Sequence, residues 1–193
     1  RLLAQKYDVV VTNPPYRGAS DVAAKLADFL KDNYKDSKSD LFAAFIEKCG
    51  ELLKPTGYQA MITQHAWMFL SSYEKLRGKL MQRDIVNMAH LGARAFEEIG
   101  GEVVQTTAFV LSKRKVSGYK ATFIRLLTGR NQREKEDRYL SGKDQYNATN
   151  DSFAKIPSYP IAAYFLKPET IELFNTPVGK YLDCKTGLIC GDN

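Results

Sequence analysis

Asp8-Val9-Val10-Val11-Thr12-Asn13-Pro14-Pro15-Tyr16, near the start of the 193-residue chain, is the stretch that decides the fold. Its unbroken run of valines predicts a β-strand buried on both faces, as in a parallel sheet flanked by helices. The two prolines end the strand, because neither can donate a hydrogen bond to a neighbouring strand. The residue before each proline is confined to extended conformations. The stretch therefore predicts a stiff loop at the carboxyl end of a strand, where open α/β sheets bind their ligands.

This loop offers two hydrogen-bond acceptors and a flat ring. The acceptors are the side-chain oxygen of Asn13 and the carbonyl oxygen of Pro14, and together they suit the two N–H groups of an exocyclic amine. Hydrogen bonds to both N–H groups favour a pyramidal nitrogen, whose lone pair can then attack an electrophile. Tyr16 can stack on the ring that carries the amine, and Pro15 stiffens the turn. The alternative interpretation is a strand-ending turn that happens to carry an aromatic residue.

The residues after the motif predict alternating helices and strands. Ser39 or Asp40 caps a helix. The turn Lys54-Pro55-Thr56-Gly57 ends that helix, and a strand follows at Tyr58–Thr63. The order strand, helix, strand predicts a parallel pair of strands. Further expected elements are a short helix capped by Ser20-Asp21, a helix at Tyr73–Gln82 with a capping box of Ser71 and Glu74, and strands at Ile85–Leu91, Val103–Leu111 and Tyr119–Leu127.

The composition fits a globular protein. Hydrophobic residues make up 44% of the chain, and no apolar run approaches a membrane-spanning length. The three cysteines, Cys49, Cys184 and Cys190, are scattered, which argues against a disulfide framework or a metal site and favours a reducing cytoplasm. Nothing in the sequence places a carboxylate or thiol beside His65, so we expect no catalytic triad or metal site there.

Positive charge is concentrated in residues 112–143. This stretch holds ten basic and three acidic residues, a net charge of +7, whereas the whole chain carries +6. Phosphate binding requires such a local excess, because each neutralised phosphate releases counterions. A solvated hairpin and helix with long basic side chains is an equally good interpretation. The polar segment Lys31–Asp40 predicts either a loop that contacts or covers substrate beside the motif, or a plain surface excursion.

The motif and three further stretches carry a family resemblance. Asp8–Tyr16 resembles the catalytic motif of amino-group methyltransferases that use S-adenosylmethionine, above all the N6-adenine DNA methyltransferases. Lys25–Tyr34, Ser37–Glu47 and Ile62–Phe69 resemble the PglX-type adenine methyltransferases of BREX phage-defence systems. The resemblance implies an α/β fold: the C-terminal half of a Rossmann-like methyltransferase sheet, followed by the start of a target-recognition domain. The implied reaction is methyl transfer from S-adenosylmethionine to the N6 amino group of an adenine flipped out of double-stranded DNA.

The resemblance implies the same roles for the motif loop as its chemistry does, and it adds two aromatic residues. Phe45 matches a position whose ring packs on the adenine ring of the cofactor. Phe109 matches an aromatic residue that touches the target base, although a shift of register by two residues would place Leu111 there. An ordinary place in the core is the competing interpretation for Phe45 and Phe109.

The resemblance also divides the chain. Residues 1–128 would form the second half of the catalytic domain, 129–155 a polar linker or insertion, and 156–193 the passage into a truncated target-recognition domain. The family's glycine-rich loop and ribose-binding acidic residue lie before the catalytic motif, and Arg1–Asp8 contains neither. We therefore expect a piece of a longer protein that alone binds S-adenosylmethionine weakly or not at all. Its first strand would be an unpaired edge, which favours self-association. Other defence-system subunits are further expected partners.

Two other functions compete with this one. Protein-glutamine and RNA-guanine amino methyltransferases carry similar tetrapeptides, but they tend to be shorter and lack a recognition domain, so residues 156–193 argue against them. The alternative from another class is a non-catalytic DNA-binding or assembly module in which the site is vestigial.

Overall fold

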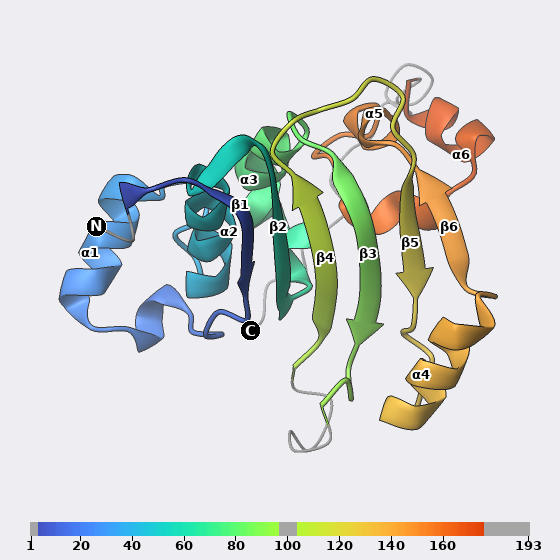
Figure 1. Ribbon diagram of the computed structural model, residues 1–193, viewed down its shortest axis with the longest axis horizontal. Helices are drawn as coiled ribbons and strands as arrows, with labels where there is room; N and C mark the ends of the chain where they lie inside the picture. The colour runs from blue at the N-terminus through green and yellow to red at the C-terminus, as the bar shows by residue number, and fades with distance from the viewer. Residues whose placement is uncertain (1–3, 97–103, 176–193) are drawn as a thin grey trace, which may run out of the picture.

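The computed structural model describes residues 4–96 and 104–175, which form a six-stranded mixed sheet with helices packed on it (Figure 1). The strands lie in the order β1-β2-β4-β3-β5-β6, which confirms the expected α/β class. The strands are β1 (Tyr7–Thr12), β2 (Leu53–Gln64), β3 (Ile85–Gly92), β4 (Thr106–Ser112), β5 (Ala121–Arg125) and β6 (Gln145–Ala148). The α-helices are α1 (Ala24–Asn33), α2 (Leu41–Glu51), α3 (Glu74–Leu80), α4 (Gln132–Ser141), α5 (Asn150–Ala154) and α6 (Pro168–Glu172). The 3₁₀ helices are Ala19–Asp21, Ala66–Met68, Ser71–Tyr73, Ile161–Phe165 and Leu173–Asn175.

Four strands of the sheet run in one direction. β1 pairs with β2 and β3 pairs with β5 in parallel, while β4 is antiparallel to both β2 and β3. Consequently β1, β2, β3 and β5 all end at the same edge, the lower one in Figure 1. The parallel pair predicted on either side of the helix capped at Ser39 or Asp40, which is α2, is confirmed. We call the edge where these four strands end the carboxyl edge.

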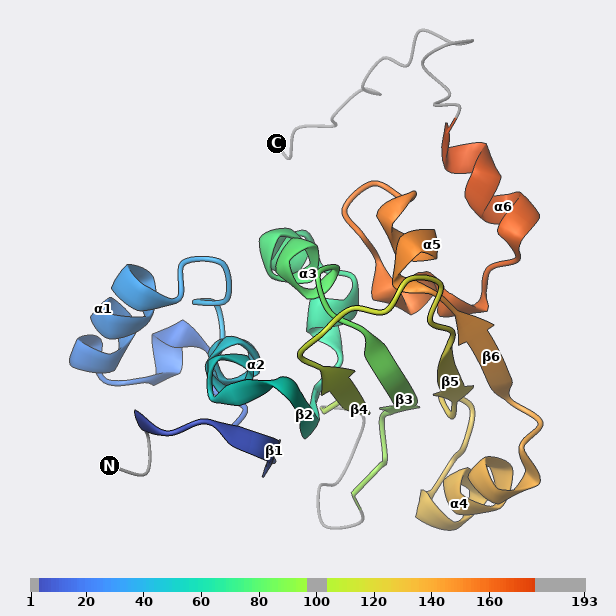
Figure 2. The same cartoon turned by 45° about the horizontal axis from the view of Figure 1, so that its top comes forward.

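One face of the sheet is covered by α2, α3 and α5 and holds the core (Figure 2). α2 begins where the sequence predicts, because the side chain of Asp40 accepts a hydrogen bond from the backbone N–H of Phe42. Each large apolar side chain that is fully buried here contributes about 1.5–3 kcal/mol relative to exposure. The largest of them include Phe42, Trp67, Leu76, Phe123 and Phe153.

The opposite face of the sheet is open over much of the part that the structure describes (Figure 2). The prediction that the valine run is buried on both faces is therefore wrong here: Val9 and Val11 are 57% and 71% exposed, and Val10 packs against the core. The reason is that successive strand side chains alternate between faces, so every second valine of the edge strand β1 lies on the open face. This face forms a hollow of about 860 Å³ whose lining includes Val11, Asn13, Ala60, Ile62, Val110 and Ile124.

β1 approaches β2 at a glycine. Tyr7 pairs with Leu53 but Val9 pairs with Tyr58, so residues 54–57 bulge out of β2. The turn predicted at these residues is this bulge, and the strand begins before it. A Cβ atom on Gly57 would lie 2.9 Å from the carbonyl oxygens of both Tyr7 and the following residue of β1. The close approach therefore requires glycine at this position.

Two helices begin differently from the prediction. α1 starts at Ala24 without a side-chain cap, after the 3₁₀ turn Ala19–Asp21. α3 starts at Glu74 after the turn Ser71–Tyr73, and Ser71 makes no capping hydrogen bond. At α3 the 3₁₀ turn runs directly into the helix, and such turns satisfy N–H groups that a capping side chain would otherwise serve. At α1, Val22 and Ala23 separate the 3₁₀ turn from the helix.

A buried arginine ties the C-terminal part of the described chain to the core. Nε of Arg77, which is fully buried, donates to the carbonyl oxygen of Ser158 at 2.9 Å. Its Nη1 donates to the carbonyl oxygens of Trp67 and Leu70 at 2.9 and 2.7 Å. Ser158 and Tyr159 both have positive φ, 66° and 53°, a conformation that is costly for residues other than glycine. Arg77 thus holds a strained turn against the loop that follows β2.

The described ranges contain no helix that is long and apolar enough to cross a membrane. Within the same ranges no group of three or more His, Cys, Asp or Glu side chains is arranged to hold a metal ion, and Cys49 is free and buried. Cys184, Cys190 and the predicted opening of the recognition domain lie outside the described residues.

Candidate active site

The motif loop leaves the end of β1 at the carboxyl edge, as the sequence predicts. Asn13 and Pro15 are exposed, Pro14 is buried, and Tyr16 is partly buried. The hydroxyl of Tyr16 donates a hydrogen bond to Oδ1 of Asn13 at 3.1 Å. This contact fixes the orientation of the Asn13 amide, whose oxygen has two lone pairs and can therefore accept a second hydrogen bond.

Tyr16 is itself held by the core. Its ring meets that of Phe42 edge to face, with centroids 6.3 Å apart, and Phe42 in turn meets Tyr73 at 5.9 Å. Burial raises the pKa of Tyr16 to about 12, so its hydroxyl keeps its proton at neutral pH and acts as a donor. The loop is thus supported by packing on α2, and the Asn13 side chain is exposed.

The two aromatic residues added by the family resemblance lie on the helix-covered side. Phe45, in α2, is partly buried and packs against the core. Phe109, in β4, is 2% exposed and packs on Trp67 with centroids 5.0 Å apart. Leu111, the alternative to Phe109, is 1% exposed. The contacts observed are those of core residues, and the roles of Phe45 at the cofactor and Phe109 at the base stay predictions.

The segment between the motif and α2 is held by hydrogen bonds between its two ends and by an ion pair further along. At its two ends, the Ala19 N–H donates to the Ser39 carbonyl, and the Leu41 N–H donates to the Arg17 carbonyl. Further along, Lys79 lies 2.7 Å from a carboxylate oxygen of Asp36. The first residues of the predicted polar loop, Lys31–Asp40, belong to α1, and the rest is an anchored excursion between α1 and α2.

About half of the basic stretch is engaged within the fold. Lys135 is 4% exposed, and its Nζ donates to the carbonyl oxygens of Leu91 and Leu126 at 2.6 and 2.7 Å. This lysine joins α4 to the ends of β3 and β5, so it is not available to phosphate. Lys113 donates to a backbone carbonyl, and Lys115, Arg130 and Arg138 pair with Asp151, Glu134 and Asp144. Exposed basic residues without such partners remain at Arg114, Lys120, Arg133 and Lys143.

Sequence analysis missed a cluster at the carboxyl edge. His65 follows β2, His90 lies in β3, and Tyr164 lies in the 3₁₀ helix Ile161–Phe165. Nδ1 of His65 is 2.8 Å from Nε2 of His90, and Nδ1 of His90 is 3.1 Å from the hydroxyl of Tyr164. No sequence signal links residues so far apart. The one available hint is that both histidines sit near the ends of predicted strands that would share an edge.

Comparison with known proteins first defines the class. Residues 2–96 match the family model of the Eco57I restriction-modification methylase. Two solved structures share the fold. One is a type I restriction-modification methyltransferase subunit from Streptococcus thermophilus (TM-score 0.58, 19% identity, 82% of this chain and 37% of that chain). The other is DrdV, solved as a DNA complex (TM-score 0.63, 16% identity, 86% of this chain and 19% of that chain). The fold is that of S-adenosylmethionine-dependent methyltransferases.

Sequence relatives then point to a particular group. The chain is 43% identical over its full length to the adenine-specific methyltransferase PglX of Lacticaseibacillus casei (strain Zhang), and this match covers 17% of that protein. It is 47% identical to the adenine-specific methyltransferase BrxX of Escherichia coli O9:H4 (strain HS) over 83% of this chain and 13% of that protein. The resemblance to PglX-type methyltransferases is thus confirmed. The chain spans less than a fifth of the length of these two relatives.

Proposed function

We propose that this chain is the part of an N6-adenine DNA methyltransferase that holds and activates the target amine. The observation that carries the proposal is the motif loop. It lies at the carboxyl edge with Asn13 exposed and its amide fixed by Tyr16 at 3.1 Å. The names of the relatives support adenine as the substrate base. The restriction-modification family model supports DNA as the substrate and a defence system as the setting.

In the proposed reaction, Asn13 Oδ1 and the Pro14 carbonyl accept hydrogen bonds from the two N–H groups of the adenine N6 amine. Held in this way, the nitrogen becomes pyramidal and its lone pair attacks the methyl carbon that bound S-adenosylmethionine supplies. S-adenosylmethionine would supply the methyl group and would leave as a neutral thioether, and the methylated amine would lose one proton to water. Tyr16 would stack on the base and hold it in line for attack.

We propose that Phe45 would pack on the adenine ring of S-adenosylmethionine and that the motif loop would hold the amine towards its methyl group. The base must leave the DNA duplex to reach Asn13, because the amine is inaccessible inside the stack. We further propose a cytoplasmic protein whose partners are double-stranded DNA and other defence-system subunits. The edge strand β1 would allow self-association when this segment is alone.

The test uses the full-length protein with tritiated S-adenosylmethionine and host-type DNA. We expect label in N6-methyladenine and its loss in Asn13→Ala, because one of the two acceptors is then missing. Asn147→Ala, which removes an exposed amide from β6, serves as the matched control and should keep full activity. Label on protein or RNA would move the assignment to a protein-glutamine or RNA-guanine methyltransferase. DNA binding without transfer would indicate a non-catalytic module.

A further inference from the structure

The motif loop is held at both of its ends. Before it, β1 ends at Thr12, which is paired with β2. After it, the carbonyl oxygen of Arg17 accepts a hydrogen bond at 3.0 Å from the backbone N–H of Leu41, the first residue of α2. Residues 13–17 lie between these two anchors and include both prolines, whose φ angles are fixed. The position of Asn13 therefore depends on where the first turn of α2 lies as well as on β1.

The first turn of α2 also contacts the loop through a side chain. The ring of Phe42, which is fully buried, meets the Tyr16 ring edge to face with centroids 6.3 Å apart. The Tyr16 hydroxyl in turn donates to Oδ1 of Asn13 at 3.1 Å. Because Leu41 and Phe42 are adjacent, one helical turn holds both the backbone that leaves the loop and the ring that orients the Asn13 amide.

Asp40 fixes the position of this first turn. The first N–H groups of an α-helix have no partner within the helix. In α2 the Phe42 N–H donates to the carboxylate of Asp40 at 3.2 Å, and the Ala44 N–H donates to the Asp40 carbonyl oxygen at 3.3 Å. A cap of this kind specifies the residue at which the helix begins. Asp40 thus determines where Leu41 and Phe42 lie against the motif loop.

Asp40 also joins α2 to the chain that leaves the motif. Its backbone pairs with that of Gly18 in an antiparallel bridge. Beside this bridge the Ala19 N–H donates to the Ser39 carbonyl oxygen at 3.1 Å. Asp40 is only 9% exposed, and a hydrogen bond shielded from water in this way is stronger than an exposed one. The cap is therefore a firm attachment between the helix and the loop.

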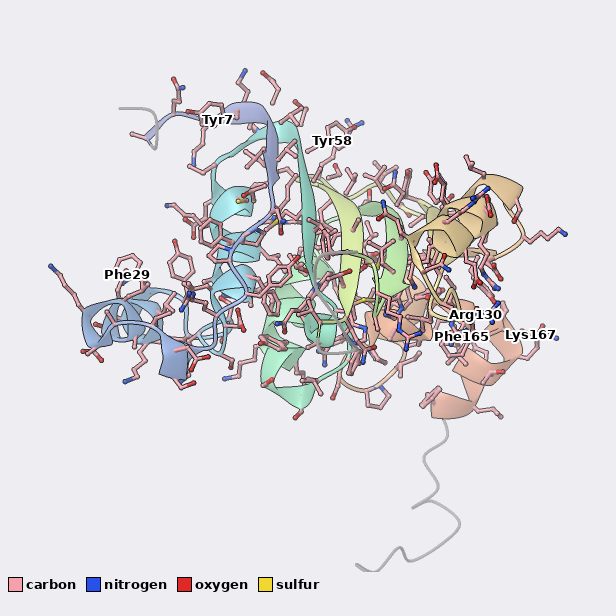
Figure 3. All side chains as sticks on the ribbon, turned by 90° about the horizontal axis from the view of Figure 1, so that it is seen from below. Tyr7, Phe29, Tyr58, Arg130, Phe165 and Lys167 are labelled. Carbon is pink, nitrogen blue, oxygen red and sulfur yellow. The ribbon has the colours of Figure 1, made fainter. Side chains whose placement is uncertain are left out.

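The bridge between Gly18 and Asp40 separates the motif loop from the excursion that follows it. That excursion, residues 19–39, contains α1 and projects outwards. Figure 3 shows Phe29 of α1 at the opposite end of the molecule from Phe165. Because the excursion is closed where it meets the motif, the link from the loop to α2 is short and does not run through α1.

We propose that Asp40 is a positioning residue for methyl transfer. By capping α2 it places the Leu41 N–H and the Phe42 ring. These two groups in turn hold the motif loop, and with it the acceptor oxygen of Asn13. What Asp40 supplies is a hydrogen-bond acceptor for the Phe42 N–H, and its negative charge is not required. This inference rests on the proposed methyl transfer to DNA and adds to it a residue that acts through the loop.

The test compares four variants of the full-length protein. Asp40→Ala removes the cap, whereas Asp40→Asn keeps an acceptor oxygen and removes only the charge, since Asp and Asn are equally good caps. Asp40→Thr is a weaker cap and gives a second measurement should Asp40→Ala fail to fold. Thr149→Ala is the matched control, because the Thr149 side chain caps α5 by accepting from the Ser152 N–H at 3.1 Å. Thr149 follows β6, which is antiparallel to β5, so this cap lies at the edge opposite the motif loop.

Three quantities are measured for each variant. Hydrogen–deuterium exchange of peptides covering residues 41–45 and 150–154 reports the first turns of α2 and α5, and loss of a cap should speed exchange there about fivefold. The rate of methyl transfer to DNA in a single turnover reports the geometry of the site without a contribution from product release. The DNA concentration at half-maximal rate reports binding.

We expect Asp40→Ala to lower the single-turnover rate about tenfold or more, because a displaced acceptor orients the amine poorly. The DNA concentration at half-maximal rate should stay within about twofold, because DNA affinity depends mainly on phosphate contacts. Asp40→Asn should keep a rate within about threefold of wild type, and Asp40→Thr should lie between Asn and Ala. Thr149→Ala should exchange faster in α5 alone and keep the wild-type rate.

Three results would overturn the inference and leave the proposed function in place. A wild-type rate in Asp40→Ala or Asp40→Thr, together with faster exchange in α2, would show that the cap does not position Asn13. An inactive Asp40→Asn with wild-type exchange in α2 would show that the carboxylate charge itself is used. An equal loss of rate in Thr149→Ala would reduce the effect to general destabilisation. A wild-type protein that methylates no DNA would instead remove the proposed function, and this inference with it.

Discussion

Replacing Arg77 by methionine should loosen two separate segments at once. Methionine has a similar length but no donor, so the carbonyl oxygens of Trp67, Leu70 and Ser158 would each lose a hydrogen bond. The last of these belongs to the turn with two positive φ angles. The variant should therefore release both the loop after β2 and the turn at residues 158–159.

The magnitude follows from the three contacts. Hydrogen bonds from a charged donor contribute about 1.5–3 kcal/mol each, which gives about 4.5 kcal/mol at the low end. Burying the guanidinium offsets part of this, because its Nη2 atom has no partner in the described chain. A buried unsatisfied group costs about 1–3 kcal/mol, so the net loss is about 3 kcal/mol. That is about a 100-fold change in a local opening equilibrium.

Hydrogen–deuterium exchange of the full-length protein, read by mass spectrometry, measures this opening locally. Peptides covering residues 66–70 and 157–160 should exchange about 100-fold faster in Arg77→Met, whereas β1 should change little. Arg133→Met, which alters an exposed residue of α4, is the control. Unchanged exchange in both peptides would refute the reasoning, and faster exchange in one alone would show that Arg77 does not couple the two segments.

Three further predictions concern charge and edges. Acidification from pH 7 to 5 should lower the free energy of unfolding by about 2 kcal/mol through His90. The pKa of His90 is about 4 in the folded chain and 6.5 in the unfolded chain, so the unfolded chain takes up the proton first and is favoured at low pH. Thermal unfolding of His90→Gln should lack this part of the pH dependence. Lys135→Met should detach α4 and speed chymotrypsin cleavage at Tyr139, a result that an exposed, purely phosphate-binding lysine would not give. Val11→Lys should reduce self-association of the isolated segment in sedimentation, and unchanged association would exclude β1 and the open face as the cause.

The order of the early elements could be predicted from the sequence because their signals are local. Asp40 before an apolar stripe specifies where α2 begins, and the two prolines of the motif specify where β1 ends. The faces of β1 could not be predicted in the same way. A run of valines does not say whether its second face is covered, because that depends on which other segments of the whole protein pack there.

In the candidate site, too, the features with a local sequence signal could be predicted, and those that depend on the tertiary fold could not. The motif loop is contiguous in sequence, so its chemistry and its place at the carboxyl edge followed from Asn13 to Tyr16 alone. The cluster of His65, His90 and Tyr164 combines residues from three elements, and only the strand order brings them together. The burial of Lys135 could not be predicted for a related reason. A lysine within a basic stretch does not indicate that its ammonium group donates to the carbonyl oxygens of Leu91 and Leu126.

The contact between Gly57 and β1 predicts what a genetic screen of the full-length protein would find. Every single-base change that replaces a glycine introduces a Cβ atom or a stop codon, and here the Cβ meets backbone oxygens at 2.9 Å, which cannot rotate away. Because β1 carries the motif loop, displacing this strand moves the acceptor oxygen of Asn13. Loss-of-function alleles should therefore accumulate at a glycine remote from the chemistry, and even the change to alanine should count among them.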